Sequence, residues 1–350
     1  MKNKEKILNE HPELRLTHYG DFVLQSGIVE KYEPIDFHAH CFDSIESMMP
    51  SKFRKQKTNY FNNSFFDLSC YPGNTKSFDF EKVGYRKWPK TTLSISGLES
   101  MAELLALKGV IPLLQNATKD RVLRDIEQNG IRKMVVLPIQ GEHGDETQNT
   151  LNMFKNQPEM MVFASIHPND KNIQTKIGSY LKQGVKGFKI APHVWNINVD
   201  DKRMINLLGY LSQTKLPVIS CSGLAIPKSF KHLPRFLKNS METQNLSKFI
   251  PVLEQFPDLK LVFAHSGLEQ NDYMIEIMKQ YPAVFSDIST QPHQNIRKMI
   301  NEIGADRLLF GSDYPFFNQA FPMLSVIKAT DDETARHKIF SLNAKRLIGV

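Results

Sequence analysis

Short apolar runs alternate with longer amphipathic segments from about residue 35 to the end of the chain. Each run is rich in β-branched or aromatic residues and ends at polar residues, Gly or Pro, which is typical of strands buried on both faces. The pattern predicts eight strands, at Pro34–Phe37, Lys133–Pro138, Met161–Ile166, Gly187–Ile190, Pro217–Ser220, Leu259–Ala264, Ala283–Ser286 and Arg307–Phe310.

Amphipathic segments between most of these runs predict helices. Lys119–Gln128 has a suitable N-cap in Thr118 and a suitable stop in Gly130. Strict alternation of strand and helix predicts a parallel sheet, and eight repeats favour an α/β fold closed as a (β/α)8 TIM barrel. The other helices are expected at Asn172–Gln183, Lys202–Thr214, Leu246–Gln255, Asp272–Gln280 and Thr334–Leu347.

A long insertion interrupts this alternation after the first predicted strand. We therefore divide the chain into a lead-in segment, 1–33, and a barrel domain, 34–350, that contains the insertion at 43–97. The insertion is rich in Lys, Asn, Ser and aromatic residues, and it leaves from the C-terminal face of the barrel, where active sites lie. We interpret it as a lid or substrate cover; a subunit contact or a flexible loop is the alternative.

Composition narrows the class of protein. Of the 350 residues, 41% are hydrophobic and 23% charged, so the chain can build a large core. The net charge of +7 is spread along the chain and no recognition motif accompanies it, so we do not expect nucleic-acid binding. No apolar stretch reaches 18 residues, and the start of the sequence carries no apolar leader. With only three cysteines, we expect a cytoplasmic protein without a membrane span.

Asp36-Phe37-His38-Ala39-His40 directly follows the apolar lead Pro34-Ile35, at the end of the first predicted strand. Side chains two residues apart on a strand point the same way, so His38 and His40 would both face the mouth of the barrel. Two converging imidazoles are the beginning of a site for Zn²⁺ or a similar cation. Without further polar residues, a structural histidine pair would explain the motif equally well.

Further polar residues follow other strands. His265 ends the sixth predicted strand and Asp313 ends the eighth, so the C-terminal face would bring both to the histidine pair. His265 could instead be a packed residue, and Asp313 an N-cap. The combination predicts a divalent-metal site. Other polar residues could line the same pocket but more often have structural roles; they are His167, His193, Glu269, Asp287 and His293.

Five motifs in this order resemble the amidohydrolase superfamily, and within it the amidohydrolase-related group that contains aminocarboxymuconate-semialdehyde decarboxylase-like enzymes. The resemblance runs from about residue 34 to the end, with the insertion unmatched. The motifs are IDFHAH at 35–40, GVKGFKI at 184–190, LVFAHSG at 261–267, LLFGSDYP at 308–315 and IFSLNAKRLIG at 339–349.

The resemblance implies roles for individual residues. His38 and His40 match the first-strand metal ligands, and Asp313 matches an aspartate that binds metal and acts as general acid and base. His265 matches a histidine that binds metal or polarises the substrate. Lys189 stands where some members carry a carboxylated lysine, although the related group often has this lysine without that role. One divalent ion is implied, with Zn²⁺ as our first expectation and Mn, Fe or Co as alternatives.

One position departs from the family pattern. Members usually carry a histidine ligand at the end of the fifth strand, where this chain has Cys221 in PVISCSG. A thiolate is a good ligand for Zn²⁺, so Cys221 could replace that histidine. It could equally be a small buried residue that leaves a weakened site.

Three functions remain open. The first is a metal-dependent hydrolase of a small amide, lactone or ester, in which Asp313 and His265 assist a metal-activated water. The second is a non-oxidative decarboxylase of a small carboxylic acid, which the same residues would support. The third is a non-catalytic barrel with a degenerate metal site. The expected partner is a small-molecule substrate, and the resemblance also suggests a homodimer.

Overall fold

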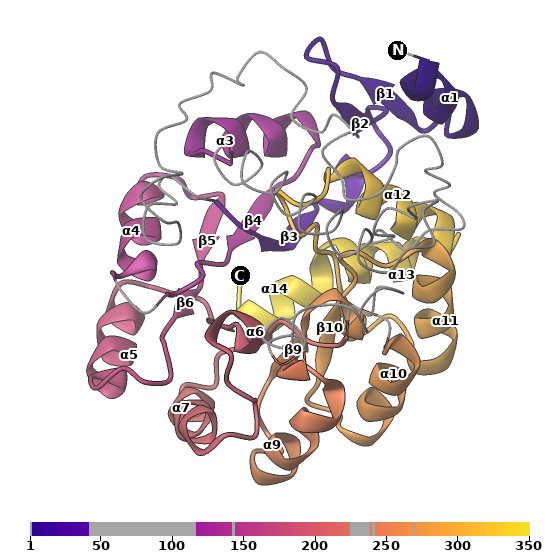
Figure 1. Cartoon of the computed structure of the whole chain (residues 1–350). Coiled ribbons are helices and arrows are strands. Elements are labelled where there is room, and N and C mark those ends of the chain that lie inside the picture. Colours follow the sequence, from indigo (N-terminus) through magenta and orange to yellow (C-terminus); the bar gives the residue numbers. More distant parts are fainter. Residues whose placement is uncertain (1, 42–116, 142–143, 225–238, 240–241, 269) are drawn as a thin grey trace, which may run out of the picture.

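The computed structural model describes residues 2–41, 117–141, 144–224, 239, 242–268 and 270–350. The insertion at 43–97 lies outside the described residues, so its role as a lid stays a prediction. The described residues contain the expected ring of parallel strands surrounded by helices (Figure 1).

The strands pair in parallel in two sets, in the orders β3-β4-β5 and β6-β7-β8-β9-β10-β11. The predicted third strand is divided at Phe163 into β5 and β6. The backbone N–H of Phe163 still donates to the carbonyl of Val136 in β4 at 3.1 Å. The strands are β3 (Ile35–Ala39), β4 (Lys133–Val136), β5 (Met160–Val162), β6 (Ala164–Ser165), β7 (Phe188–Ile190), β8 (Val218–Ser220), β9 (Leu261–Phe263), β10 (Phe285–Asp287) and β11 (Leu308–Leu309).

Backbone hydrogen bonds connect the first strand of the ring to the last. The N–H of Phe37 donates to the carbonyl of Phe310 at 2.8 Å, and the N–H of His40 donates to that of Tyr314 at 2.7 Å. In the other direction, the N–H of Asp313 donates to the carbonyl of His38 at 2.7 Å. Because β3 adjoins the segment after β11, residues near 38 and near 313 are neighbours, and the predicted TIM barrel is confirmed.

Helices cover the outside of the ring (Figure 1). All six predicted segments are helical. The segment predicted as one helix at Thr334–Leu347 comprises α13 (Glu333–His337), the π-helical η9 (Lys338–Leu342) and α14 (Asn343–Ile348). The remaining elements are α3 (Lys119–Gln128), α4 (Glu146–Met153), α5 (Ile173–Lys182), α6 (Pro192–Trp195), α7 (Lys202–Gln213), η7 (Leu246–Phe249), α9 (Ile250–Gln255), η8 (Ala264–Gly267), α10 (Asn271–Gln280), α11 (His293–Ile303) and α12 (Ala320–Ala329).

Two apolar clusters hold the barrel together, one between strands and helices and one inside the ring. Burial of each large side chain in them contributes about 1.5–3 kcal/mol. Residues of α14 join the inner cluster, and α14 lies across the centre of the ring in Figure 1. The inner cluster contains Ile35, Phe37, Val135, Leu137, Met161, Phe163, Ile219, Val262, Ala264, Leu309, Ala344, Leu347 and Ile348.

The lead-in segment packs on the barrel's outer helices. It contains α1 (Lys2–Glu10), an antiparallel hairpin of β1 (Leu14–Leu16) and β2 (Phe22–Leu24), and η1 (Glu30–Tyr32). The Phe22 ring lies 5.6 Å from that of Phe321 in α12, and the Asn318 side-chain amide donates to the Phe22 carbonyl at 2.8 Å.

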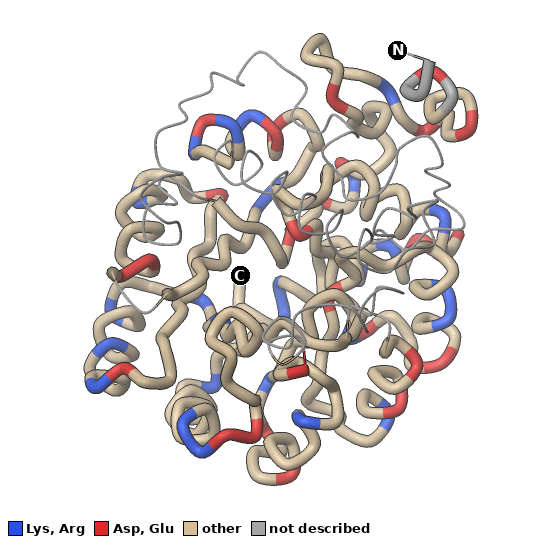
Figure 2. The backbone as a smooth tube through the Cα atoms, in the orientation of Figure 1, with Lys and Arg blue, Asp and Glu red and all other residues tan. Residues whose placement is uncertain are grey.

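The surface of the described part is mixed in charge. Acidic and basic residues are interspersed over the outer helices rather than gathered in one stripe (Figure 2). Among the described residues, no helix has both the length and the apolar character needed to cross a lipid bilayer.

Candidate metal centre

Three residues from different strands meet at the carboxyl ends of the barrel strands. His38 lies near the end of β3, His265 in the turn after β9, and Asp313 in the segment after β11. His265 has φ 60° and Asp313 has φ 59°, in the left-handed region that is unfavourable for residues with a Cβ. Such strain costs about 1–3 kcal/mol per residue and is commonest at functional sites.

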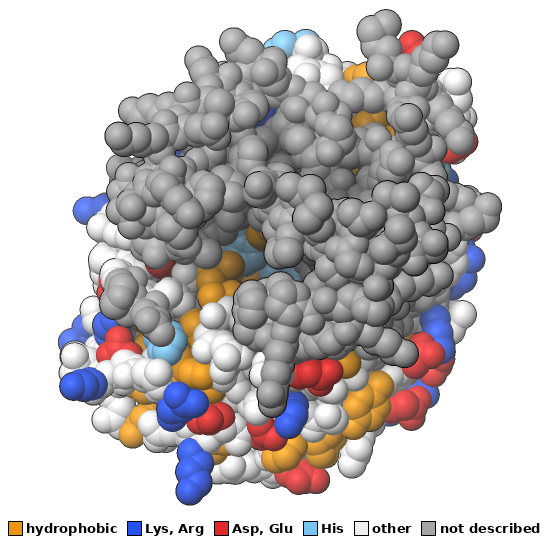
Figure 3. Space-filling view, in the orientation of Figure 1, with side chains coloured by type: hydrophobic (Ala, Val, Ile, Leu, Met, Phe, Trp, Pro, Cys, Tyr) orange, Lys and Arg blue, Asp and Glu red, His pale blue; other side chains and the backbone are white. Residues whose placement is uncertain are grey.

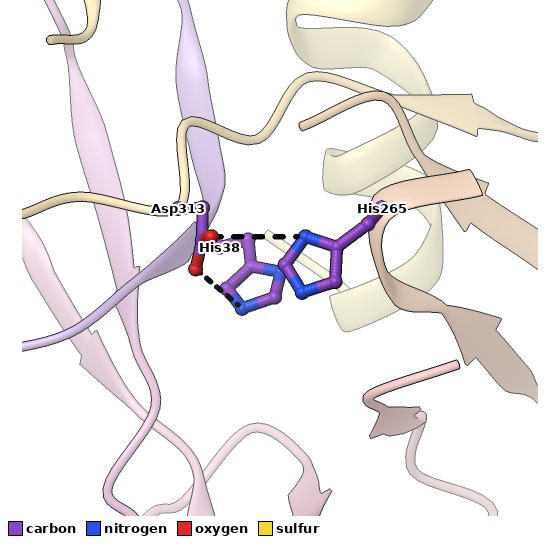
Figure 4. Close-up of side chains that lie close together, drawn as sticks. All are labelled: His38, His265 and Asp313. Carbon is purple, nitrogen blue, oxygen red and sulfur yellow. Dashed lines mark ion pairs between the residues drawn. The ribbon is translucent and has the colours of Figure 1, made fainter. Parts of the chain in front are cut away.

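The side chains of His38 and His265 point toward the Asp313 carboxylate (Figure 4). His38 Nε2 lies 3.6 Å from Asp313 Oδ1, and His265 Nδ1 lies 3.9 Å from Asp313 Oδ2. One ligand atom from each of the three residues lies within 4.8 Å of the others, and all three residues are buried. Two imidazoles and a carboxylate at this separation form a donor set for a divalent transition-metal ion.

His38 is prepared as a neutral ligand. Its Nδ1 donates to Asp287 Oδ2 at 2.9 Å, so the lone pair lies on Nε2. Burial lowers the pKa of His38 to about 4 although Asp287 raises it, so the imidazole is neutral at pH 7. Its Nε2 is buried without any hydrogen-bond partner in the described part of the chain. A buried acceptor of this kind is costly unless a cation takes the lone pair, so the site fits a metal ion.

His40 faces the same carboxylate. Its Nδ1 donates to the Leu137 carbonyl at 2.7 Å, which directs the other nitrogen, Nε2, toward Asp313 Oδ1 at 3.7 Å. The structure therefore brings His38, His40 and His265 around Asp313, as the strand ends predict.

Asp287 connects two of the histidines. Besides His38, it accepts hydrogen bonds from the backbone N–H of His265 at 3.2 Å and from the Ser289 hydroxyl. The Ser289 hydroxyl in turn lies 2.8 Å from His265 Nδ1. Burial raises the pKa of Asp287, but the two imidazoles and Ser289 outweigh it, and the pKa is lowered overall. Asp287 was a minor candidate from its place at the end of a predicted strand, whereas Ser289 was not identified.

Asp36 holds the two ligand segments together, a role that the sequence did not reveal. Its carboxylate accepts from the backbone N–H groups of Ser312 at 2.9 Å and His38 at 3.2 Å, and from Gln319 Nε2 at 3.2 Å. The Ser312 hydroxyl also donates to it. Burial raises the pKa of Asp36 to about 7. A carboxylate within an otherwise apolar strand was the available signal.

Cys221 lies just beyond β8 and is buried, but it is not a member of the group formed by His38, His265 and Asp313. Burial raises the pKa of the Cys221 thiol, but Lys189, His193 and His265 together lower it by more. The pKa is therefore well below its usual value. Its role as a metal ligand stays a prediction.

The group formed by His38, His265 and Asp313 contains none of the other described minor candidates. His167 accepts from the backbone N–H of Asn169 at 3.1 Å, and its ring lies 5.5 Å from that of Trp195. His293 begins α11, and Glu269 is outside the described residues. Histidine and hydrophobic side chains are visible in a hollow near the centre of the face in Figure 3.

Comparison with solved structures gives similar folds at low identity. The 5-carboxyvanillate decarboxylase of Novosphingobium aromaticivorans, complexed with manganese and 4-hydroxy-3-methoxy-5-nitrobenzoic acid, is 16% identical and has a TM-score of 0.60 over 94% of this chain and 99% of its own. The 2,6-dihydroxybenzoate decarboxylase of Rhizobium is 16% identical, with a TM-score of 0.55 over 68% and 90%. A probable 2-pyrone-4,6-dicarboxylic acid hydrolase of Acinetobacter baumannii is 13% identical, with a TM-score of 0.54 over 91% and 100%.

The sequence itself identifies the family. A search of curated proteins found no match. The model of the amidohydrolase family, however, matches residues 35–350, which include all four residues of the candidate centre. The chain therefore belongs to the amidohydrolase family of enzymes.

Proposed function

We propose that the chain is a metal-dependent, non-oxidative decarboxylase of a small carboxylic acid. The observation that carries this proposal is the buried Nε2 of His38, which has no described hydrogen-bond partner and faces the Asp313 carboxylate at 3.6 Å. The likeness to 5-carboxyvanillate decarboxylase, which covers 94% of this chain, supports decarboxylation over our first expectation of hydrolysis.

In this proposal His38, His40 and Asp313 hold one divalent cation, with His265 beside them. We propose Mn²⁺ and Zn²⁺ as the first ions to test, because imidazole and carboxylate together suit both, and because similar decarboxylases were solved with manganese. When bound, the cation supplies a Lewis acid for the substrate carboxylate and a neighbouring oxygen.

The protein residues supply the proton and the orientation. The bond between the carboxyl carbon and its neighbour breaks, the electron pair stays on that neighbour, and Asp313 gives it a proton as CO₂ leaves. His265, fixed by Ser289 and by its backbone contact to Asp287, is placed to donate a hydrogen bond to a substrate oxygen. The left-handed backbone at Asp313 and His265 serves to aim both side chains inward.

Hydrolysis remains the second candidate, because one similar structure is a probable pyrone hydrolase. The same Asp313 would then take a proton from water and return it to the leaving group. A barrel without catalysis is the third candidate, and Cys221 in place of a histidine is the feature that favours it.

The test is a substrate panel. Protein loaded with Mn²⁺ or Zn²⁺ is incubated with 5-carboxyvanillate, 2,6-dihydroxybenzoate and 2-pyrone-4,6-dicarboxylate, and released CO₂ and ring-opened acid are measured separately. We expect CO₂ from a carboxylate substrate and a loss of at least ~100-fold in Asp313→Asn. Ring opening without CO₂ would replace the proposal with hydrolysis, and no turnover by the metal-loaded protein would favour the non-catalytic barrel.

A further inference from the structure

Lys189 is the middle residue of β7 and points into the barrel. Its neighbours Phe188 and Ile190 belong to the outer apolar cluster, so alternation along the strand turns Lys189 the other way. Its register partner on β8 is Ile219, which is a member of the inner cluster. A basic side chain therefore stands among the apolar residues that fill the ring.

The amine of Lys189 has no hydrogen-bond partner in the described part of the chain. The residue is 0% exposed. No ion pair joins Nζ to a carboxylate among the described residues either. Removing an ammonium from water without an acceptor is strongly unfavourable, so a packed apolar residue of the same volume would stabilise the barrel more. The cost indicates that the charge is kept for something that binds there.

The charge of Lys189 acts on the candidate metal centre. It contributes to lowering the pKa of His38 and, on the neighbouring strand, that of Cys221. Ile219 is the register partner of Lys189, and Cys221 lies two residues beyond Ile219, toward the carboxyl end of the strand. The Cα of Lys189 is therefore two residue positions below that of Cys221 in the barrel. The flexible stem of a lysine is long enough to carry its ammonium toward the level of the metal ligands.

We infer that Lys189 is a specificity-determining residue whose buried ammonium binds a carboxylate of the substrate beside the metal centre. This inference rests on the proposed function, because it states that the substrate of the same site carries a carboxylate. A compact ammonium gives a point charge rather than a two-pronged contact, so it selects for negative charge more than for shape. Neutral analogues of the substrate should gain nothing from it.

The test uses Lys189→Met, which conserves volume and removes the charge, with the exposed Lys182→Met of α5 as the matched control. Binding of 2,6-dihydroxybenzoate and of its neutral amide to the Mn²⁺-loaded proteins is measured by calorimetry. We expect Lys189→Met to bind the carboxylate ~10–100-fold more weakly than the parent does, because a charged hydrogen bond is lost. The amide should bind all three proteins equally.

Thermal unfolding of the same proteins without ligand separates function from structure. We expect the Tm of Lys189→Met to equal or exceed that of the parent, because a buried charge without a hydrogen-bond partner has been removed. Carboxylate affinity that is unchanged in Lys189→Met would overturn the inference. A lowered Tm with unchanged affinity would show instead that Lys189 has an internal counter-ion such as Cys221.

The binding measurement does not depend on turnover. If the carboxylate binds through Lys189 but no CO₂ is released from any substrate, the decarboxylase proposal fails and this inference stands. If CO₂ is released equally well by parent and Lys189→Met, at equal carboxylate affinity, the inference fails and the decarboxylase proposal stands.

Discussion

Asp287 is the residue through which the protein controls its candidate metal ligands, since it contacts both His38 and the His265 backbone. In Asp287→Asn the side chain keeps its size but loses the negative charge that orients the His38 imidazole. We expect metal affinity to fall ~10–100-fold, measured by competition with a chromophoric chelator. The control is Asp201→Asn, at the partly exposed N-cap of α7, which should bind metal as the parent does. Equal affinity in Asp287→Asn and the parent would refute this role.

Asp36 should give the fold a characteristic pH dependence. Its pKa is about 7 in the fold against an ordinary value of 3.8, so the native state holds one more proton than the unfolded chain between those values. The free energy of unfolding therefore decreases as pH rises from about 4 to about 7, by roughly 4 kcal/mol from this residue.

Asp36→Asn should remove that contribution. Urea unfolding of parent and variant across this pH range measures it, and the difference between the two proteins cancels the opposite slope expected from His38, whose pKa is lowered. Parallel pH profiles for the two proteins would show that Asp36 does not titrate in this range.

At the residue scale, the polar residues at the strand ends could be predicted, but the hydrogen-bond partners that orient them could not. His38, His265 and Asp313 follow apolar runs directly, so their convergence can be inferred from a parallel barrel. The partner of His38 is 249 residues away, at Asp287, and that of His40 is a backbone carbonyl, at Leu137. No local pattern encodes such pairings.

The ends of β8 and β9 approach each other through two glycines. A Cβ on Gly223 would lie 1.9 Å from the carbonyl oxygen of Gly267, and Gly223 has φ 86°. We expect Gly223→Ala to lower the free energy of unfolding by ~3 kcal/mol or more, because both the contact and the backbone conformation oppose a side chain.

Gly178→Ala is the matched control. Gly178 lies inside α5, where an added Cβ meets no atom within 4 Å. This variant should be more stable than the parent by ~0.5–1 kcal/mol, since alanine favours the helix. Denaturant unfolding of both variants gives the comparison, and equal effects of the two substitutions would contradict the close approach of β8 and β9.

At the element scale, the helices that were predicted have a regular apolar stripe, and two of those that were missed, α4 and α12, lack one. The buried residues of α4 are Thr147 and Thr150, so it lacks an apolar face. In α12 eight of ten residues are buried, which leaves no polar face to reveal a period. By contrast, α7 buries Met204, Leu207 and Leu211 at helical spacing, so the pattern was sufficient to predict it. The helix α11 also has an apolar stripe, but the sequence analysis did not predict it.

A buried ion network joins the lead-in segment to the barrel and to the residue after Asp313. Arg121 of α3 donates to Asp21 at 3.1 Å and to Asp125 at 2.9 Å, and the hydroxyl of Tyr314 donates to Asp125 at 3.1 Å. Arg121 is 2% exposed. Arg121→Met leaves two buried carboxylates without this partner, so we expect the free energy of unfolding to fall by about 3–5 kcal/mol.

The matched control for this network is Arg203→Met. Arg203 pairs with Asp201 at 2.8 Å, but its side chain is 49% exposed, so its loss should cost at most about 1 kcal/mol. Chemical denaturation measures both variants. If Arg121→Met is no less stable than Arg203→Met, the network does not support the barrel in the way that its burial implies.

At the scale of the whole molecule, the sequence was sufficient to predict the barrel and the family but not the reaction. Eight apolar runs and the order of the motifs determine both. Hydrolysis and decarboxylation need the same histidines and the same aspartate, so their positions do not separate the two. The choice depends on what the site binds, and we propose that the buried Lys189, whose Nζ has no described hydrogen-bond partner, favours a carboxylate.

The most direct test of the metal centre is elemental mass spectrometry of protein purified without chelators or a histidine tag and then incubated with Mn²⁺ or Zn²⁺. We expect about one equivalent of metal in the parent and in His167→Ala, whose ring packs beside Trp195, and none in His38→Ala. No bound metal in the parent, or equal metal in His38→Ala, would contradict the centre on which the proposed function rests.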